Sequence, residues 1–221
     1  MTTPQVEMLR DCVSILEERY PKPEWAFVAL VEWAGSHFSF IQEKQVYLPT
    51  PTMTEAIHNR LLETFNVKLL QADCWDWWGE TALALELEGW VGQWPDRAKI
   101  EAAAEQFATS ITSPTHTFYD RNADTGRLLL AVWSRCRTGI MLGQSRTRNP
   151  YHLCLLNMAC QEVTSHIYKG NQSLHDLANP LWELSNLWGG AAGFKHGRPI
   201  SHNYNRLAMM KRVAARKAAK T

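Results

Sequence analysis

Arginine is concentrated in a short central stretch of this chain. Six arginines occur between residues 121 and 148, and no lysine accompanies them. A guanidinium group donates hydrogen bonds from a rigid fork that fits a phosphate, and its flat face stacks on bases. The stretch is therefore a candidate for contacting nucleic acid. Its members are Arg121, Arg127, Arg135, Arg137, Arg146 and Arg148.

Charge is divided unevenly between the two halves of the chain. Residues 1–120 hold 18 acidic and 8 basic side chains, a net charge of −10. Residues 121–221 hold 4 acidic and 15 basic side chains, a net charge of +11. Such asymmetry favours an anionic partner for the basic half. The alternative is that the two halves pair with each other, within one molecule or between the subunits of an oligomer.

Two further segments carry cations downstream. Residues 189–205 are rich in glycine and intersperse aromatic residues with cations, which suits either base stacking with phosphate binding or a flexible hinge. Residues 206–221 favour a helix and lack acidic side chains, so they suit either phosphate contact or a solvated end. The predicted nucleic-acid-binding residues are Arg135, Arg137, Arg146, Arg148, Lys195, Arg198, Arg206, Lys211, Arg212 and Arg216.

Five residues separate Arg146 from His152 at the entrance to an amphipathic segment. This spacing resembles the arginine–histidine motif of the HEPN-type ribonucleases, which are all-helical and usually dimeric. The resemblance covers seven residues and implies cleavage of RNA that depends on His152. Our default interpretation is that His152 is a surface residue in the first turn of a helix, and we predict no catalytic residue.

Other reactive side chains do not form a pattern that identifies a reaction. The five cysteines are scattered and include no Cys-x-x-Cys pair, which is typical of reduced, buried thiols. Helical spacing separates Cys154 from His152, Cys160 and His166, so we predict no metal site. The sequence also lacks the glycine-rich phosphate-binding patterns and the nucleophile elbow. We therefore predict no cofactor.

Tryptophan is abundant between residues 75 and 94. Most of these rings should lie in the core, because their large area dominates burial. Trp77 and Trp78 are adjacent, so we expect one of them to be half exposed and available to a protein partner. Asp73, Asp76 and Glu80 would share one helical face beside these rings. Paired acids can perform acid–base catalysis, but this pattern is more typical of a polar edge on an aromatic core.

Apolar periodicity predicts a mainly α fold. It indicates helices at 5–19, 24–34, 53–70 and 96–111, one carrying Leu129 and Val132, one that begins near Pro150 and runs to Lys169-Gly170, one from Ser173 to Trp188, and a basic C-terminal helix. The helix that begins near Pro150 has the cleanest pattern, with apolar residues at spacings of 3, 4, 3 and 4 as far as Ile167.

Some segments favour a small β element. Residues 37–48 and 81–91 alternate in part between apolar and other side chains, and residues 116–119 suit a short strand. Residues 120–126 are rich in turn formers, so they either close a hairpin or precede a helix. We favour the helix.

The chain of 221 residues suits a single domain. We predict a helical globular domain at 1–198, acidic and Trp-rich to residue 120 and basic thereafter, with a basic tail at 199–221. No apolar run approaches the ~18 residues of a membrane span, and the N-terminus lacks the pattern of a secretory signal. We therefore expect a cytoplasmic protein without membrane contact.

These observations favour a non-catalytic protein that binds the DNA or RNA backbone through its Arg-rich C-terminal half. It would serve as a subunit of a nucleoprotein complex, with the acidic, Trp-rich half available to a protein partner. Two alternatives are an assembly factor whose charged halves dock an oligomer or partner, and a HEPN-like RNase.

Overall fold

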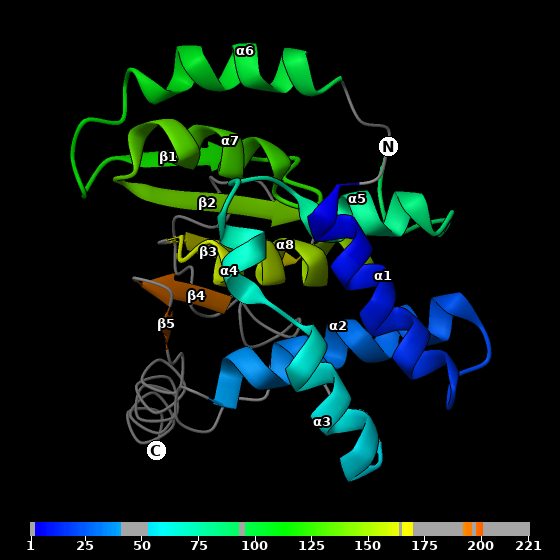
Figure 1. Cartoon of the computed structure of the whole chain (residues 1–221). Helices are drawn as coiled ribbons and strands as arrows, with labels where there is room; N and C mark the ends of the chain where they lie inside the picture. The colour runs from blue at the N-terminus through cyan, green and yellow to red at the C-terminus, as the bar shows by residue number, and fades with distance from the viewer. Residues whose placement is uncertain are drawn as a thin grey trace, which may run out of the picture.

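A computed structural model of the chain describes residues 3–40, 53–92, 96–163, 165–169, 192–195 and 198–200. It is mainly helical, as the apolar periodicity predicts (Figure 1). The helices are α1 (Pro4–Glu17), α2 (Pro23–Phe40), α3 (Glu55–Thr64), α4 (Val67–Gln71), α5 (Trp77–Ala84), α6 (Arg97–Ala108), α7 (Arg127–Cys136) and α8 (Arg148–Cys160). The strands are β1 (Thr117–Asp120), β2 (Ile140–Ser145), β3 (Ser165–Lys169), β4 (Ala192–Lys195) and β5 (Arg198–Ile200).

The β element forms one sheet in the order β1-β2-β3-β4-β5. The first three strands are parallel, and α7 and α8 form the two crossovers between them. β4 and β5 continue the sheet as an antiparallel hairpin. Because parallel strands share a direction, the loops that follow β1 and β2 meet at the same end of the sheet.

Four of the eight described helices, α3 to α6, begin at a polar residue that caps the first turn. The side chains of Thr54, Asn66, Asp76 and Asp96 each accept a hydrogen bond from a backbone N–H of the helix that follows. Such caps satisfy donors that a helix leaves unpaired. The expected helix at 53–70 is divided, since α3 ends at Thr64 with Phe65 as its C-cap, and Asn66 then caps α4.

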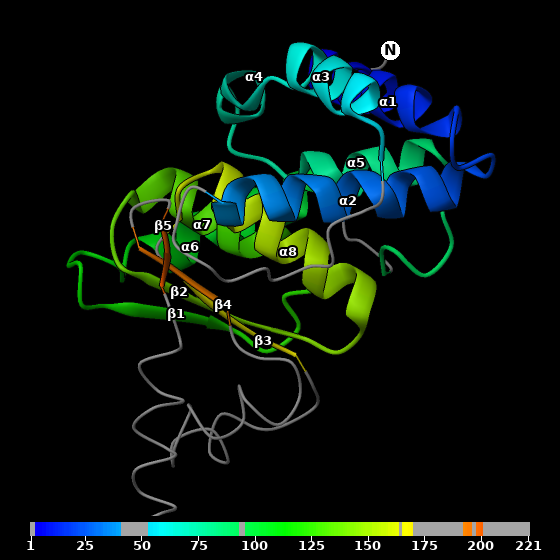
Figure 2. The same cartoon turned by 90° about the horizontal axis from the view of Figure 1, so that it is seen from below.

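The molecule is built in tiers above the sheet. Figure 2 shows the sheet below, α7 and α8 on one side of it, α2 and α5 beyond them, and α1 and α3 farthest away. α6 packs on α7. The tier that contains α8 is thus enclosed between the sheet and the outer helices, and residues 153–160 are buried on every side of that helix.

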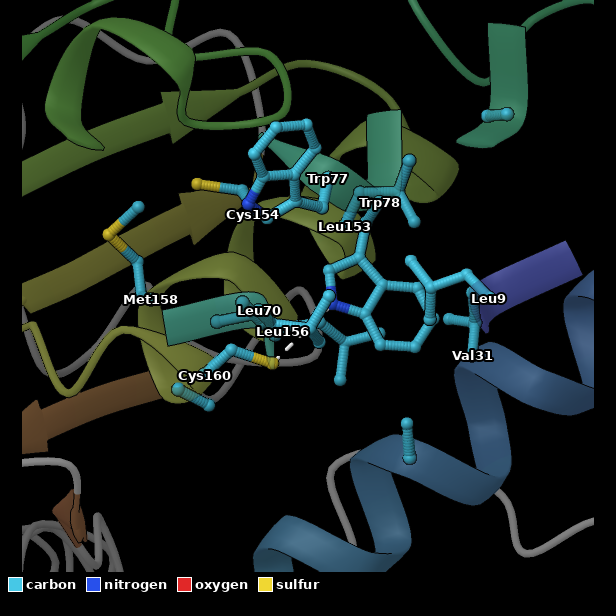
Figure 3. Close-up of a cluster of buried hydrophobic side chains, with 14 of the residues drawn as sticks. Leu9, Val31, Leu70, Trp77, Trp78, Leu153, Cys154, Leu156, Met158 and Cys160 are labelled. Carbon is cyan, nitrogen blue, oxygen red and sulfur yellow. Dashed lines mark hydrogen bonds between the residues drawn. The ribbon is translucent and has the colours of Figure 1, made fainter. Parts of the chain in front are cut away.

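The core between α8 and the outer helices is apolar and aromatic. Figure 3 shows Trp78 of α5 among Leu9, Val31 and Leu153, which come from α1, α2 and α8. Its indole Nε1 donates a hydrogen bond to the sulfur of Cys160 over 3.5 Å, so the polar edge of the buried ring is satisfied. Burial raises the pKa of the Cys160 thiol to about 12, which keeps it protonated.

One expectation about this core is wrong. Trp77 and Trp78 are both buried, with 4% and 0% of their surface exposed. A helix on the surface would expose one of two adjacent residues, but α5 lies between α1 and α8 and is covered on both sides. Among the tryptophans that the structure describes, Trp25 at the start of α2 is half exposed, at 50%.

The β element lies outside both segments that the alternation favours. Residues 37–40 belong to α2, and residues 81–84 complete α5; residues 41–48 fall outside the described part of the chain. The expected strand near residues 116–119 is confirmed as β1, and the helix after residue 126 is confirmed as α7.

The helix that begins near Pro150 is shorter than expected. α8 ends at Cys160, Glu162 adopts a left-handed backbone conformation with φ 53°, and Ile167 lies in β3. α8 is buried on every side, so apolar residues occur all around it. A buried strand is also rich in apolar residues. The apolar spacing therefore does not mark the point where the helix ends and β3 begins. The expected helices at 173–188 and in the basic C-terminal segment lie outside the described residues.

Candidate functional site

The fold divides the central arginines between the two ends of the parallel strands. α7 runs antiparallel to the strands, so its last turn, with Arg135 and Arg137, lies at their amino ends. β2 then runs the length of the sheet, about 17 Å for six residues, before Arg146 and Arg148 follow at the carboxyl end. A sequence interval of nine residues therefore separates two different surfaces.

At the amino ends, part of the arginine charge is already neutralised. Arg135 forms an ion pair with Glu105 of α6 over 2.9 Å, and it also donates a hydrogen bond to the carbonyl oxygen of Ala131. Arg137 is exposed and takes the left-handed conformation that ends α7, with φ 49°. The backbones of Lys195 and Arg198 also lie toward this end, because β4 runs past the first residue of β3.

At the carboxyl ends, three exposed arginines form no ion pair with a described carboxylate. Arg121 follows β1, Arg146 follows β2, and Arg148 is the first residue of α8. Burial raises the pKa of Glu32 in α2, and the charge of Arg148 opposes this rise. We call the exposed cations Arg121, Arg146, Arg148 and Lys99 the carboxyl-end cluster.

A pocket of about 760 Å³ lies beside this cluster, and two of its four cations line it. This volume lies in the range of ~300–1,000 Å³ that is usual for small-molecule sites. Its apolar lining comes from the helical side: Val91 after α5, Ile100 and Ala103 of α6, and Leu128 of α7. Lys99 and Arg146 also line it, and both are exposed.

The polar lining of the pocket comes from the strand ends. Asp120 is the last residue of β1, and one of its carboxylate oxygens accepts a hydrogen bond from the backbone N–H of Asn122 over 2.8 Å. Burial raises the pKa of Asp120, although that hydrogen bond opposes the rise. Gln144 of β2 accepts a hydrogen bond from the hydroxyl of Tyr119 over 2.7 Å. These contacts hold both side chains at the pocket wall.

The loop at residues 120–126 forms a hydrogen bond with the backbone of Gly92. Asp124 adopts the left-handed conformation, with φ 48°, and its carboxylate accepts a hydrogen bond from the backbone N–H of Gly92 over 2.9 Å. A Cβ on residue 92 would lie 2.9 Å from that same carboxylate oxygen. A larger residue at position 92 would therefore displace the Asp124 carboxylate from its present position.

A buried carboxylate anchors the same loop from below. Asp76 is fully buried and accepts hydrogen bonds from Thr125 over 2.5 Å, from Asn157 over 2.6 Å and from the backbone N–H of Gly79 over 2.9 Å. Asp76 thus ties α5 to the loop and to α8. Burial raises the pKa of Asp76 to about 6, against the opposing effect of Arg127 and these donors.

Arg127 completes this buried network and does not belong to the exposed cluster. Its guanidinium lies 3.4 Å from Asp76 and 2.6 Å from Glu80, and it also stacks on the ring of Trp75, whose centroid is 4.9 Å away. Arg97 lies over the same ring at 4.3 Å. Of the three acids expected at a polar edge of the aromatic core, Asp76 is instead fully buried, and Asp76 and Glu80 both neutralise an arginine from the basic half. The third, Asp73, pairs with Arg97 of the acidic half.

Four predicted binding residues, Arg206, Lys211, Arg212 and Arg216, lie outside the described residues. Of the remaining six, only Arg146 and Arg148 lie at the carboxyl ends, beside the pocket. Asp120, Gln144 and Lys99 were not singled out as site residues. Asp120 carried a usable signal, because a polar residue that ends a strand and precedes a helix lies where ligands commonly bind parallel sheets.

The arginine–histidine motif runs from the turn after β2 into α8. Arg146 follows β2, whereas His152 lies in the first turns of α8. The all-helical architecture that the HEPN resemblance implies is not observed, since the motif is part of a parallel βαβ unit. Within the described ranges, no group of three or more His, Cys, Asp or Glu side chains could hold a metal ion, and no helix there is both long and apolar enough to cross a bilayer.

Comparison of the chain with protein-family models, with curated proteins and with solved structures finds no match.

Proposed function

We propose that the protein binds the phosphate backbone of a nucleic acid at the carboxyl ends of its parallel strands, through Arg121, Arg146, Arg148 and Lys99. One observation carries this proposal: at that end of the sheet, Lys99 and Arg146 line a pocket, Arg121 and Arg148 lie next to lining residues in the sequence, and these exposed cations form no ion pair with a described carboxylate. Such cations attract phosphate without first breaking an internal pair. The proposal keeps Arg146 and Arg148 from the sequence analysis and adds Arg121 and Lys99.

The start of α8 supports an anionic ligand. Its N-cap residue, Thr147, makes no side-chain hydrogen bond to the first turn, and Thr147 lines the pocket. The N-terminus of a helix carries partial positive charge and exposed N–H donors, both of which favour phosphate. The helix thus adds to the charge of Arg146 and Arg148.

The support beneath the cluster favours binding at low entropic cost. The loop that carries Arg121 is fixed through Asp124 and Thr125, and Arg146 and Arg148 flank the start of a buried helix. Side chains on a fixed backbone lose less conformational freedom on binding than those of a fraying segment. We therefore expect the carboxyl-end cluster to contribute more affinity than the basic tail.

The test is binding of short single-stranded and duplex oligonucleotides over a range of salt concentrations. Replacing Arg121, Arg146 and Arg148 together with glutamine should weaken binding by roughly tenfold or more, since each charge-assisted hydrogen bond contributes about 1.5–3 kcal/mol. The slope of log affinity against log salt should become shallower by about 2 to 3, because each phosphate contact contributes about 0.7 to 0.9.

The matched control replaces Arg135 and Arg137, at the opposite end of the sheet, with glutamine. This variant should retain most of the affinity and of the salt slope. A chain without residues 206–221 should bind only modestly more weakly for every probe. If the control variant loses binding while the carboxyl-end variant keeps it, the nucleic-acid surface lies at the amino ends and the proposal is wrong.

A further inference from the structure

We propose that the pocket receives the base of one unpaired nucleotide of the bound strand, and that it favours bases carrying an exocyclic amino group over thymine and uracil. This inference rests on the proposed function and adds a preference to it. The preference comes from the chemistry of the pocket lining rather than from the cations.

The lining suits a flat ring with a polar edge. Ile100, Ala103 and Leu128 offer an apolar surface on the helical side of the pocket, and the polar groups come from the strand ends. A base placed there would stack against the aliphatic side chains and turn its hydrogen-bonding edge toward the strands. A paired base has its edge occupied by its partner, so the pocket suits a single strand.

Asp120 supplies the acceptor that would read that edge. One of its carboxylate oxygens accepts the N–H of Asn122, and no donor among the described residues reaches the other. The side chain is half-buried, so a hydrogen bond to it is less weakened by solvent than one on an open surface. The pocket therefore presents an acceptor for which the described part of the protein provides no donor.

A hydrogen-bond acceptor at this position would discriminate between bases according to whether they carry an exocyclic amino group. Cytosine, adenine and guanine carry amino groups that donate hydrogen bonds, whereas thymine and uracil present a carbonyl oxygen at the position where cytosine has its amino group. The donor of thymine and uracil on that edge is the ring N3–H, and a carbonyl oxygen flanks it on each side. A carboxylate attracts the amino group and repels the carbonyl oxygen. Lys99 and Arg146 at the rim would meanwhile hold the phosphates that flank the base.

The experiment compares oligo(dC) with oligo(dU) at neutral pH and one fixed salt concentration. The two bases differ in the 4-substituent and in the hydrogen that uracil carries on N3. The wild type should bind oligo(dC) about tenfold more tightly, in line with the discrimination of a good base contact. Asp120→Asn should reduce this ratio toward one or invert it, since the new amide can donate to the uracil carbonyl. Asparagine still accepts from Asn122, so the loop retains its hydrogen bond.

A second variant tests the same proposal if Asp120→Asn does not fold. Ala103→Leu narrows the pocket from α6 without changing its polar groups, and it should remove the preference while salt-dependent binding to both oligomers remains. Equal binding of oligo(dC) and oligo(dU) to the wild type, with a clear salt dependence, would overturn the base preference and leave the proposed function standing. Absence of salt-dependent binding to every probe would overturn both.

Binding of a free nucleotide distinguishes a pocket that holds one base of a strand from a pocket that holds a small molecule. If the base is held as part of a strand, dCMP should bind more weakly than oligo(dC), because it lacks the neighbouring phosphates. Binding of dCMP as tight as that of oligo(dC) would show that the pocket serves a free nucleotide, contrary to the proposal.

Discussion

The two ends of the parallel strands are built from similar residues and are used differently. At the amino ends, Arg135 pairs with Glu105, and His116 folds back to contact the carbonyl oxygen of Ser110. At the carboxyl ends, Arg121, Arg146 and Arg148 are exposed, and Arg146 lines a pocket. The charge at the amino end is thus partly neutralised within the protein, whereas the exposed arginines at the carboxyl end form no described ion pair.

This difference shows why the number of charges did not locate a site. The six central arginines divide into Arg127 and Arg135, which neutralise carboxylates of the acidic half, and four that form no described ion pair. The acidic and basic halves therefore do pair within the molecule, as one alternative predicts, but only through part of the series. What distinguishes the rest is where the fold places them.

The largest change in stability is expected from replacing Asp76, the buried carboxylate that anchors the loop at the carboxyl ends of the strands. Asp76→Ala should lower the free energy of unfolding by about 3–5 kcal/mol, because it leaves Arg127 buried with a weakened counter-charge and removes the acceptor of Thr125 and Asn157. Denaturant titration measures this loss.

Asp73→Ala is the matched control for Asp76→Ala. Asp73 also pairs with an arginine, Arg97, but both side chains are nearly half exposed, so this change should cost less than about 1 kcal/mol. Equal losses in the two variants would mean that the buried network does not stabilise the carboxyl end.

Alanine substitutions at three glycines with positive φ would compare how tightly the two ends of the strands are packed. Gly126, Gly139 and Gly89 have φ of 88°, 87° and 74°. A Cβ at Gly139, at the amino end, would lie 2.5 Å from Ile111 and 2.9 Å from a backbone carbonyl, whereas one at Gly126 would meet only the flexible side-chain ends of Cys154 and Met158 closer than 3 Å. We expect losses of about 2–5 kcal/mol for Gly139→Ala and about 1–3 kcal/mol for Gly126→Ala.

Gly89→Ala provides the baseline, because nothing lies within 4 Å of its added Cβ. It should cost only the backbone strain, about 1–2 kcal/mol. Thermal or chemical unfolding of the three variants should therefore rank Gly139 above Gly126 and Gly126 above Gly89. A larger loss at Gly126 than at Gly139 would show that the carboxyl end is the more rigidly packed of the two.

The sequence predicted the elements whose patterns are local. α1, α6 and α7 follow from apolar residues on one face and from turn formers at their ends. β2 was not predicted, because Ile140–Ser145 contains a glycine and no regular alternation, and its strand character depends on the neighbours β1 and β3. Without β2, the division of the arginines between two ends of a sheet could not be foreseen.

The pocket was missed for the same reason. Asp120, Lys99 and Arg146 are distant in sequence, and they meet only because parallel strands bring successive loops to one end. Arg146 and Arg148 were predicted from residue type alone, which also selected Arg135, whose charge is paired. Residue type thus identified suitable chemistry, and topology decided which residues share a surface.

The pH dependence of stability should distinguish the buried carboxylate from the exposed charges. The pKa of Asp76 rises from 3.8 to about 6 on folding, so the folded state binds the proton more tightly than the unfolded state. Stability from this group is therefore full below about pH 4 and falls as pH rises to about 6, by roughly 3 kcal/mol at 1.4 kcal/mol per pKa unit. Unfolding measurements across this range test the sign.

Asp76→Asn is the control for the pH effect, since asparagine does not titrate. The difference in unfolding free energy between the wild type and this variant should change between pH 4 and pH 6, while carboxylates elsewhere cancel in the comparison. A constant difference across that range would show that Asp76 is ionised throughout and that its donors outweigh its burial.

The smallest change in stability is expected when single arginines at the two ends of the strands are replaced. These variants also separate a role in the fold from a role in binding. Arg135→Gln removes the ion pair with Glu105, whose side chain is 75% exposed, so the loss of stability should be less than about 1 kcal/mol. That loss should shrink further at high salt, because salt screens exposed pairs. Arg146→Gln breaks no described ion pair, so the unfolding free energy should not change measurably.

Nucleic-acid binding should respond in the opposite order. Arg146→Gln removes one cation from the carboxyl-end cluster and should weaken binding of any oligonucleotide, with a slope against log salt shallower by about 0.7 to 0.9. Arg135→Gln should leave both affinity and slope unchanged, because its charge is already neutralised. Melting curves and salt titrations of the two variants supply both measurements. If Arg146→Gln instead lowers stability while Arg135→Gln lowers affinity, the roles of the two ends are reversed: the closed end binds the ligand, and the open end stabilises the fold.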